Sequence, residues 1–501
     1  MKGRLSGQLS SHELWWVIGF CLFAAVRVLL FSAAFPFFNN VDERRHLDLV
    51  IKYAEGHIPH GTELISPATL PYLSHYASPE FLSAPESFEG GYFGPMWKHP
   101  AEEVAPTIAR IEEIWSRTPN QECSQPPPYY VVAAAWFHIG QWIGFKDGGT
   151  LYWVRFLNTL LMPALVWVAY VAARLMFPEQ VALRLGVPLL IATVPQDAFY
   201  GINNDVLSPI CFGLLFLCLL KLFSADSLNK SWAVLTGVAF AATYLVKTGN
   251  LPLLAVAALA ILFRTGQWKS VGSLRRMILP LALLASCALL PIAIWTAWFE
   301  HAFGDLTASS AKIKMLGWTA KPFLAWFEHP IFSLKGAWNF WHELIASFWR
   351  GEMHWHTQRL AASGADLFYC LSTTIFIITA LVSWRTRCSV RTRIEQVSPC
   401  LSLCCFVAAI CFYILLSIMF DFGNCPYPSR EFPYFASGRL MSGLMIPVAL
   451  LYVQGLAWCL SFTKRKWIVL LAVVLIVSGI TASEIVITYP VFTSEFNFYH
   501  L

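Results

Sequence analysis

Apolar runs of about 20 residues recur along this chain, and they restrict its fold more than any other feature of the sequence. Each run can cross the hydrocarbon core of a bilayer, about 30 Å thick, as one α-helix. The composition agrees, because 57% of the residues are hydrophobic and only 13% are charged, whereas a soluble domain has about 25% charged residues. The sequence therefore predicts an all-α, polytopic membrane protein.

The apolar runs and their flanks predict about eleven transmembrane helices. They are expected near residues 14–35, 151–175, 183–198, 206–222, 231–246, 251–264, 277–299, 367–384, 400–420, 438–460 and 467–488. The first run is too long for the apolar core of a cleavable signal peptide, so we expect an uncleaved anchor. A twelfth run, 126–145, starts with three prolines and contains His138 and Gln141. We expect it to form a helix that lies against the outer membrane interface.

Basic residues in the short connections predict the orientation, because positively charged short loops stay on the cytoplasmic side. If the N-terminus, with Lys2 and Arg4, is cytoplasmic, nearly all of these charges fall on that side. They are Arg174, Arg184, Lys221, Lys230, Arg264, Lys269, Arg275, Arg276, Arg385, Arg387, Arg391, Arg393, Lys464, Arg465 and Lys466. We therefore expect a multi-pass protein of the inner (plasma) membrane with a cytoplasmic N-terminus.

With this orientation, two long polar segments, 36–150 and 300–366, lie outside the cytoplasm. The first contains a predicted surface helix at 101–117, in addition to the juxtamembrane helix at 126–145. We expect residues 1–501 to form a single membrane domain that these loops cover at one end. The net charge of +5 is too small to indicate nucleic acid as a partner.

An acidic pair, Asp42 and Glu43, directly follows the first apolar helix, and His46 lies three residues further on. A carboxylate at a helix end can stay at the water–membrane boundary without the cost of deep burial. There it could act as a general base toward a hydroxyl group, or bind a divalent cation such as Mg²⁺ or Mn²⁺. The alternative is a solvated helix end at which the arginines 44 and 45 pair with the two acids.

Three more charged residues fall at expected outer helix ends. Asp205 follows two asparagines, and it could be a functional acid or a helix cap. Lys247 lies in a short outer turn, where it could bind phosphate or extend its ammonium group from the membrane to water. Arg439 begins a helix among small residues, and an arginine side chain can bind phosphate oxygens through two hydrogen bonds.

Glu352, His354 and His356 alternate along the second long loop. In an extended segment their side chains would share one face, which suits a metal site, together with Asp42 and Asp205 as further candidate ligands. The alternative is an aromatic-rich surface loop near the lipid headgroups. Cys123 and Cys425 lie in the outer loops, and the sequence leaves open whether they form a disulfide.

The order of several short motifs resembles the GT-C superfamily of polytopic glycosyltransferases, and in particular a little-characterised group of bacterial predicted membrane proteins. The motifs are VDERRH (41–46), AEGHIP (54–59), QPPPYYVV (125–132), VRFLNTL (154–160), YGINNDVLS (200–208), KTGN (247–250) and SGRLM (437–441). Two positions depart from the superfamily pattern: Val41 replaces a proline, and Gln125 replaces a histidine.

This resemblance implies transfer of a sugar from a polyprenyl-phosphate donor to a hydroxyl on a glycan, lipid or protein acceptor at the outer membrane face. It implies Asp42 or Glu43 as the base or metal contact, and Asp205 as a second acid. Lys247 and Arg439 would contact the donor phosphate. Two other functions stay open, namely a transporter or flippase for lipid-linked sugars, and a non-catalytic membrane scaffold.

Overall fold

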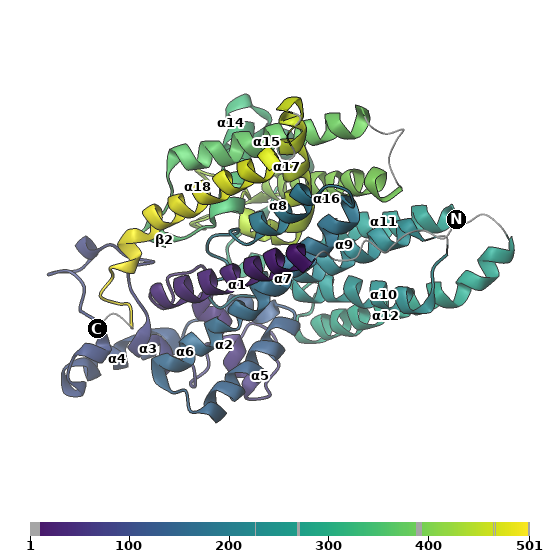
Figure 1. Cartoon of the computed structure of the whole chain (residues 1–501). Helices are drawn as coiled ribbons and strands as arrows, with labels where there is room; N and C mark the ends of the chain where they lie inside the picture. Colours follow the sequence, from purple (N-terminus) through teal and green to yellow (C-terminus); the bar gives the residue numbers. More distant parts are fainter. Residues whose placement is uncertain are drawn as a thin grey trace.

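The computed structural model describes residues 11–225, 227–267, 271–386, 393–463, 465 and 467–498, and it is mostly helical with very little β-structure (Figure 1). Within these ranges, nine helices are long and apolar enough to cross a membrane. Two shorter apolar helices correspond to the expected spans 183–198 and 231–246. The predicted all-α membrane fold is confirmed.

Several basic residues used for the orientation lie outside the described residues: Lys2, Arg4, Lys269, Arg387, Arg391, Lys464 and Lys466.

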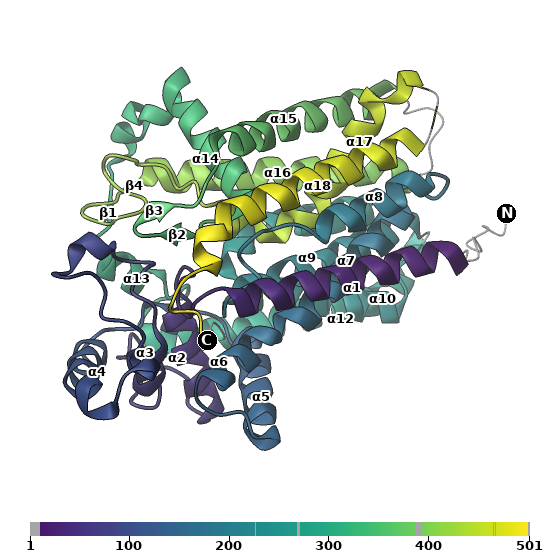
Figure 2. The ribbon, with the colours of Figure 1, turned by 60° about the vertical axis from the view of Figure 1, so that its left-hand side comes forward.

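The chain up to residue 191 forms eight α-helices among the described residues. They are α1 (Ser11–Ala34), α2 (Glu43–Ala54), α3 (Leu70–Tyr76), α4 (Ala101–Ser116), α5 (Pro128–Ile143), α6 (Asp147–Phe156), α7 (Asn158–Met176) and α8 (Val181–Ile191). α5 lies beside the bundle and packs on α2, roughly across the direction of the long helices (Figure 2). It coincides with the expected juxtamembrane helix, and α4 coincides with the predicted surface helix.

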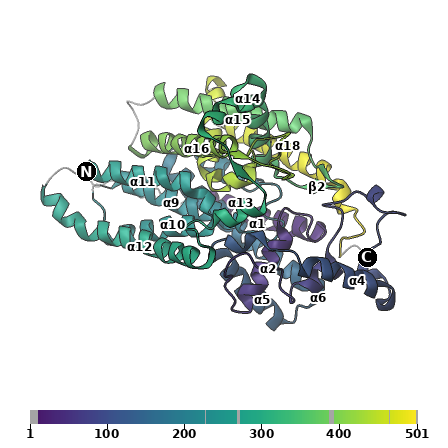
Figure 3. The ribbon, with the colours of Figure 1, turned by 180° about the vertical axis from the view of Figure 1, so that it is seen from behind.

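The remainder of the chain completes the bundle. Its helices are α9 (Ser208–Ser224), α10 (Lys230–Val246), α11 (Leu251–Gly266), α12 (Val271–Phe303), α13 (Ser309–Met315), α14 (Leu334–Arg350), α15 (Ser363–Thr386), α16 (Arg393–Met419), α17 (Met445–Cys459) and α18 (Trp467–Phe492). Two short antiparallel pairs join β1 (Thr319–Ala320) to β4 (Phe420–Asp421) and β2 (His354–Trp355) to β3 (Gln358–Arg359). Seen from behind, α10 and α12 run side by side at one edge (Figure 3).

Both long polar segments lie at one end of the bundle, which we call the loop-bearing end (Figure 2).

α8 ends at Ile191, seven residues earlier than the expected end of its span. Pro195 lacks a backbone N–H, and a proline disfavours helical geometry in the residue before it. The chain therefore leaves the helix and runs as a buried, irregular segment through Asp197 and Tyr200.

A buried ion pair between Glu43 and Arg155 fixes the start of the first loop. Arg155 Nε and Nη2 donate to the two Glu43 carboxylate oxygens at 2.7 and 2.8 Å, and both side chains are 1% exposed. The same oxygens accept from the backbone N–H groups of Phe38 and Ile202. Arg155 also donates to three backbone carbonyls near the end of α1. One pair therefore joins α1, α2, α6 and the segment before α9.

A second set of contacts attaches the C-terminal segment to the first loop. Ser78 and Ser494 both donate to Glu80 Oε2, at 2.8 and 2.7 Å. The backbone N–H of His356 donates to the Glu80 carbonyl oxygen. Burial raises the pKa of the Glu80 carboxyl to about 7, although the hydrogen bonds from the serines act in the opposite direction.

The Glu43–Arg155 pair leads to the first prediction. Replacing one partner leaves an uncompensated buried charge, which typically costs about 3–5 kcal/mol. We expect Arg155→Met to lower the free energy of unfolding by about this amount. Arg117→Met is the matched control, because Arg117 pairs with Glu113 on the exposed surface of α4 and such pairs contribute about 0–1 kcal/mol. Equal thermal stability of the two variants in detergent would contradict this assignment.

Glu80 gives a pH-dependent prediction. Because its pKa is higher in the folded protein than in the unfolded chain, its protonation stabilises the fold at low pH. This contribution is complete below about pH 4.5 and is lost as pH rises through about 7. A difference of one in pKa is worth about 1.4 kcal/mol, so the loss is about 3 kcal/mol. We expect the melting temperature of Glu80→Gln to vary less between pH 5 and 8 than that of the wild type, whereas a Glu113→Gln control should follow the wild type.

Candidate active site

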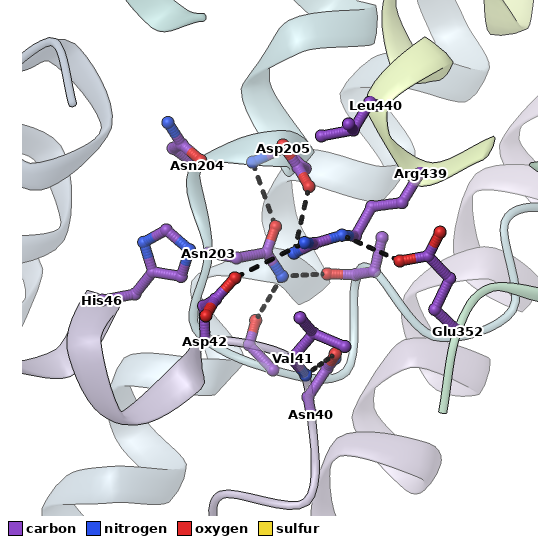
Figure 4. A network of polar contacts seen from close by, with 12 residues as sticks. Asn40, Val41, Asp42, His46, Asn203, Asn204, Asp205, Glu352, Arg439 and Leu440 are labelled. Atoms are coloured by element: carbon purple, nitrogen blue, oxygen red, sulfur yellow. Dashed lines mark hydrogen bonds and ion pairs between the residues drawn. The ribbon is translucent and has the colours of Figure 1, made fainter. Parts of the chain in front are cut away.

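Five charged side chains from separate parts of the chain meet at the loop-bearing end. All of them except Lys247 are labelled in Figure 4. Asp42 precedes α2, Asp205 lies in the 3-10 helix η4 (Asn204–Leu207), and Lys247 follows α10. Glu352 follows α14, and Arg439 lies in the 3-10 helix η9 (Gly438–Leu444), which leads into α17. We call these five residues the charged cluster.

Arg439 lies at the centre of the charged cluster. Its Nη2 is 3.5 Å from Asp42 Oδ2, its Nη1 is 3.6 Å from Asp205 Oδ2, and its Nε is 3.5 Å from Glu352 Oε2. The three carboxylates therefore face three different nitrogens of one guanidinium group, as Figure 4 shows. The Arg439 side chain is 12% exposed, so water screens these charges only weakly.

Lys247 supplies the second cation of the cluster. Its ammonium group pairs with Asp205 Oδ1, whereas Arg439 faces Oδ2 of the same carboxylate. Burial lowers the pKa of Lys247 and the nearby Arg439 lowers it further, although Asp205 acts in the opposite direction. The cap role considered for Asp205 belongs to Asn203, whose side chain accepts from the Asp205 N–H.

Asp42 and Glu43 are consecutive but face different surroundings. Asp42 has a φ of 61° and a ψ of 4°, in the left-handed region that aspartate adopts more readily than most residues. This turn directs Asp42 toward Arg439, whereas Glu43 reaches back to Arg155 in the interior. Asp42 Oδ1 also accepts from Arg45 and Gln121, both at 3.2 Å. Of the acidic pair, only Asp42 joins the charged cluster.

His46 lies one helical turn further along α2, beside the cluster (Figure 4). Its Nδ1 is 2.8 Å from the hydroxyl oxygen of Tyr130 on α5. Burial lowers the pKa of His46, although nearby carboxylates, Glu122 first, act in the opposite direction. A lowered pKa favours the neutral imidazole at pH 7, which can donate or accept a hydrogen bond.

Two acids next to the cluster were not predicted from the sequence. Glu122 is buried, pairs with Lys312 of α13 at 2.8 Å, and accepts from Gln125 at 2.6 Å. Burial raises the pKa of Glu122, but Lys312 and His46 outweigh this effect and hold it well below its usual range. The only feature of the sequence that pointed to Glu122 was its position shortly before the three prolines.

Asp197 is the other acid. It accepts from the Glu352 N–H at 2.6 Å, and burial raises its pKa to about 7. Gly351 permits this approach, because its φ is +81° and a Cβ there would come within 2.0 Å of Asp197. Asp197 was not predicted as a site residue because it lies in the apolar run 183–198, which was expected to be a transmembrane helix.

The expected grouping of Glu352, His354 and His356 does not form. His356 has a φ of 51° in the turn between β2 and β3, so the segment is not extended there and the two imidazoles do not share a face. His354 Nδ1 lies 2.8 Å from the Glu352 carbonyl oxygen, and His356 contacts the ring of Tyr92. Within the described residues, no three His, Cys, Asp or Glu side chains are arranged to hold a metal ion.

Cys123 and Cys425 are separate free thiols. Cys123 Sγ lies near the ammonium group of Lys52, whereas the Cys425 thiol faces the carbonyl oxygen of Tyr427. The structure therefore contains no disulfide between them. Burial raises the pKa of the Cys123 thiol to about 11, which favours the protonated, unreactive form.

The comparisons with known proteins give one family and a distant structural likeness. No curated protein matches the chain. Among solved structures, the oligosaccharyltransferase of Archaeoglobus fulgidus in its apo form is 12% identical, with a TM-score of 0.40 over 96% of this chain and 56% of that one. The complex of the same enzyme with Zn and sulfate gives 12% identity and a TM-score of 0.37, over 94% and 53%. This chain thus spans about half the length of these structures.

The family comparison covers most of the chain. The family described as Predicted membrane protein (DUF2142) matches residues 23–425, which include four members of the charged cluster and all α-helices from α2 to α16. The expected likeness to a group of predicted membrane proteins is confirmed at this level, whereas membership of the GT-C superfamily stays a prediction. The chain belongs to the DUF2142 family of predicted membrane proteins.

Proposed function

We propose that this protein is a membrane-embedded glycosyltransferase that moves a sugar from a polyprenyl-phosphate donor to an acceptor hydroxyl at its loop-bearing end. The observation that carries this proposal is the position of Asp42 next to Arg439, with Lys247 paired to the Asp205 carboxylate that Arg439 also faces. One carboxylate that can accept a proton thus lies beside two cations that can bind an anionic leaving group.

The two cations account for the larger part of the proposed catalysis. As the bond between the anomeric carbon and the phosphate oxygen breaks, negative charge grows on the phosphate. Fixed cations that face this charge in a site with little water stabilise the transition state strongly. Arg439 and Lys247 are both held in place by Asp205, so they need little rearrangement when the phosphate arrives.

Asp42 is the proposed general base, and Glu43 is not. A general base must lie within hydrogen-bond reach of the hydroxyl that it deprotonates. Glu43 is 1% exposed, and both its oxygens accept hydrogen bonds from Arg155. The Asp42 side chain is 18% exposed, and its Oδ2 faces Arg439 of the cluster. It would take the acceptor proton while the acceptor oxygen attacks the anomeric carbon and inverts its configuration.

The distribution of charge favours an enzyme over the transporter considered above. A transporter is expected to place its polar site near the middle of the membrane, between matching broken helices. Here the five charges of the cluster lie at helix ends, on one side of the bundle. A site at one face suits the transfer of a group to an acceptor outside the membrane.

A direct test compares Asp42→Asn with the wild type in transfer from a radiolabelled polyprenyl-phosphate hexose or pentose. Loss of a general base typically lowers the rate by about 10²–10⁴-fold. We expect a decrease of this size at unchanged thermal stability, and no decrease for the control Glu113→Gln on α4. Full activity of Asp42→Asn would exclude Asp42 as the base. Movement of the lipid between leaflets without transfer would favour the flippase, and neither activity would favour a scaffold.

The proposal also requires the loop-bearing end to face away from the cytoplasm, with the N-terminus inside. A membrane-impermeant maleimide should label Ser116→Cys, at the end of α4, in intact cells. Thr265→Cys, at the exposed opposite end of α11, should react only after the membrane is permeabilised. The wild type, labelled in parallel, corrects for the native cysteines. The reverse pattern would place the candidate site in the cytoplasm and contradict the proposed reaction.

A further inference from the structure

Three carboxylates gathered around one position raise the question of a divalent cation. Mg²⁺ and Ca²⁺ bind oxygen ligands at about 2.0–2.6 Å, so the carboxylate oxygens of a metal site must converge around a common centre. Asp42, Asp205 and Glu352 come together here from three distant parts of the chain. Their negative charges can be neutralised either by a bound metal ion or by basic side chains of the protein.

The centre of this group is already filled by protein. Each of the three carboxylates lies 3.5–3.6 Å from a different nitrogen of Arg439, around the edges of its planar guanidinium group (Figure 4). The atoms of Arg439 therefore stand between the oxygens. A metal ion could contact all three acids only if this side chain moved away.

The backbone that carries Arg439 is held firmly. The N–H of Gly438 donates to Ser347 Oγ of α14 at 2.8 Å. A Cβ at Gly438 would lie 2.1 Å from the backbone nitrogen of Phe348, so η9 and α14 are in close contact. The position of Arg439 is thus set by the packing of two helices and not by a flexible loop.

The charges of the group are also balanced without a metal. Besides Arg439, Lys247 pairs with Asp205, and Arg45 donates to Asp42 Oδ1. Three basic side chains therefore face three acidic ones. A divalent cation would therefore enter a site whose acids already have basic partners.

We propose that the Arg439 guanidinium occupies the position that a divalent metal would take among Asp42, Asp205 and Glu352, so that the site works without such an ion. The claim that catalysis needs no metal rests on the proposed glycosyl transfer. The claim that Arg439 fills the metal position does not, and a metal-binding experiment alone can test it.

The experiment measures Mn²⁺ binding by electron paramagnetic resonance on purified, chelator-treated protein. We expect Arg439→Ala to bind one Mn²⁺ more than the wild type, because removing the guanidinium leaves three carboxylates around an open centre. Arg439→Lys, which keeps a positive charge, should resemble the wild type. Adding Asp205→Asn to Arg439→Ala should abolish the extra binding, and thermal melts verify that each variant is folded.

Two results of the binding experiment would overturn the proposal. In the first, the wild type itself binds Mn²⁺, and Asp205→Asn abolishes that binding, so the metal enters the site while Arg439 is present. The other is a folded Arg439→Ala that gains no Mn²⁺. The same preparations are also assayed for sugar transfer, and a chelator should leave the activity of the wild type unchanged. If the chelator abolished transfer and added Mg²⁺ or Mn²⁺ restored it, the proposal would also be overturned. Absence of all transfer would count against the proposed function alone, because the Mn²⁺ measurement does not depend on it.

Discussion

The buried Glu43–Arg155 pair is the contact on which the geometry of the loop-bearing end depends. Its two short hydrogen bonds, with further bonds to five backbone groups, join the end of α1 to α2, α6 and the segment before α9. An ionised pair at this depth is tolerated only when nearly every polar atom has a partner. Glu43 is thereby fixed toward the interior, and the residue before it must turn the other way.

That turn produces the candidate site. With Glu43 held inside, Asp42 adopts a left-handed conformation, which costs about 1–3 kcal/mol for a residue other than glycine. Such a cost persists where the surrounding structure imposes it, often at functional sites. Here it brings Asp42 to Arg439, and through Arg439 to Asp205 and Glu352. A structural ion pair and a functional cluster are thus built from two adjacent acids.

The sequence predicted the all-α membrane fold because long apolar runs leave the chain few alternatives in a bilayer. It also placed Asp42, Asp205, Lys247 and Arg439 at one end, since each lies next to the end of an apolar run. Their catalytic roles stay predictions. The early end of α8 was missed, although Pro195 marks it, because the apolar run continues past Ile191.

Other features could not be read from the sequence because they depend on tertiary contacts. Nothing local separates Asp42 from Glu43, since the partner of Glu43 lies more than a hundred residues away. Glu122 and Asp197 are likewise defined by Lys312 and by the backbone of Glu352. The shared face suggested for His354 and His356 does not form, because a left-handed residue bends the β2–β3 turn.

The central claim is that the charged cluster receives the phosphate of a lipid-linked sugar. A density map of the protein with a bound polyprenyl phosphate tests it most directly. We predict the phosphate within hydrogen-bond distance of both Arg439 and Lys247, with the lipid tail running between helices toward the membrane. A phosphate bound at the opposite end instead, for example in the cavity of about 450 Å³ beside Gln454 and Trp458, would contradict the claim.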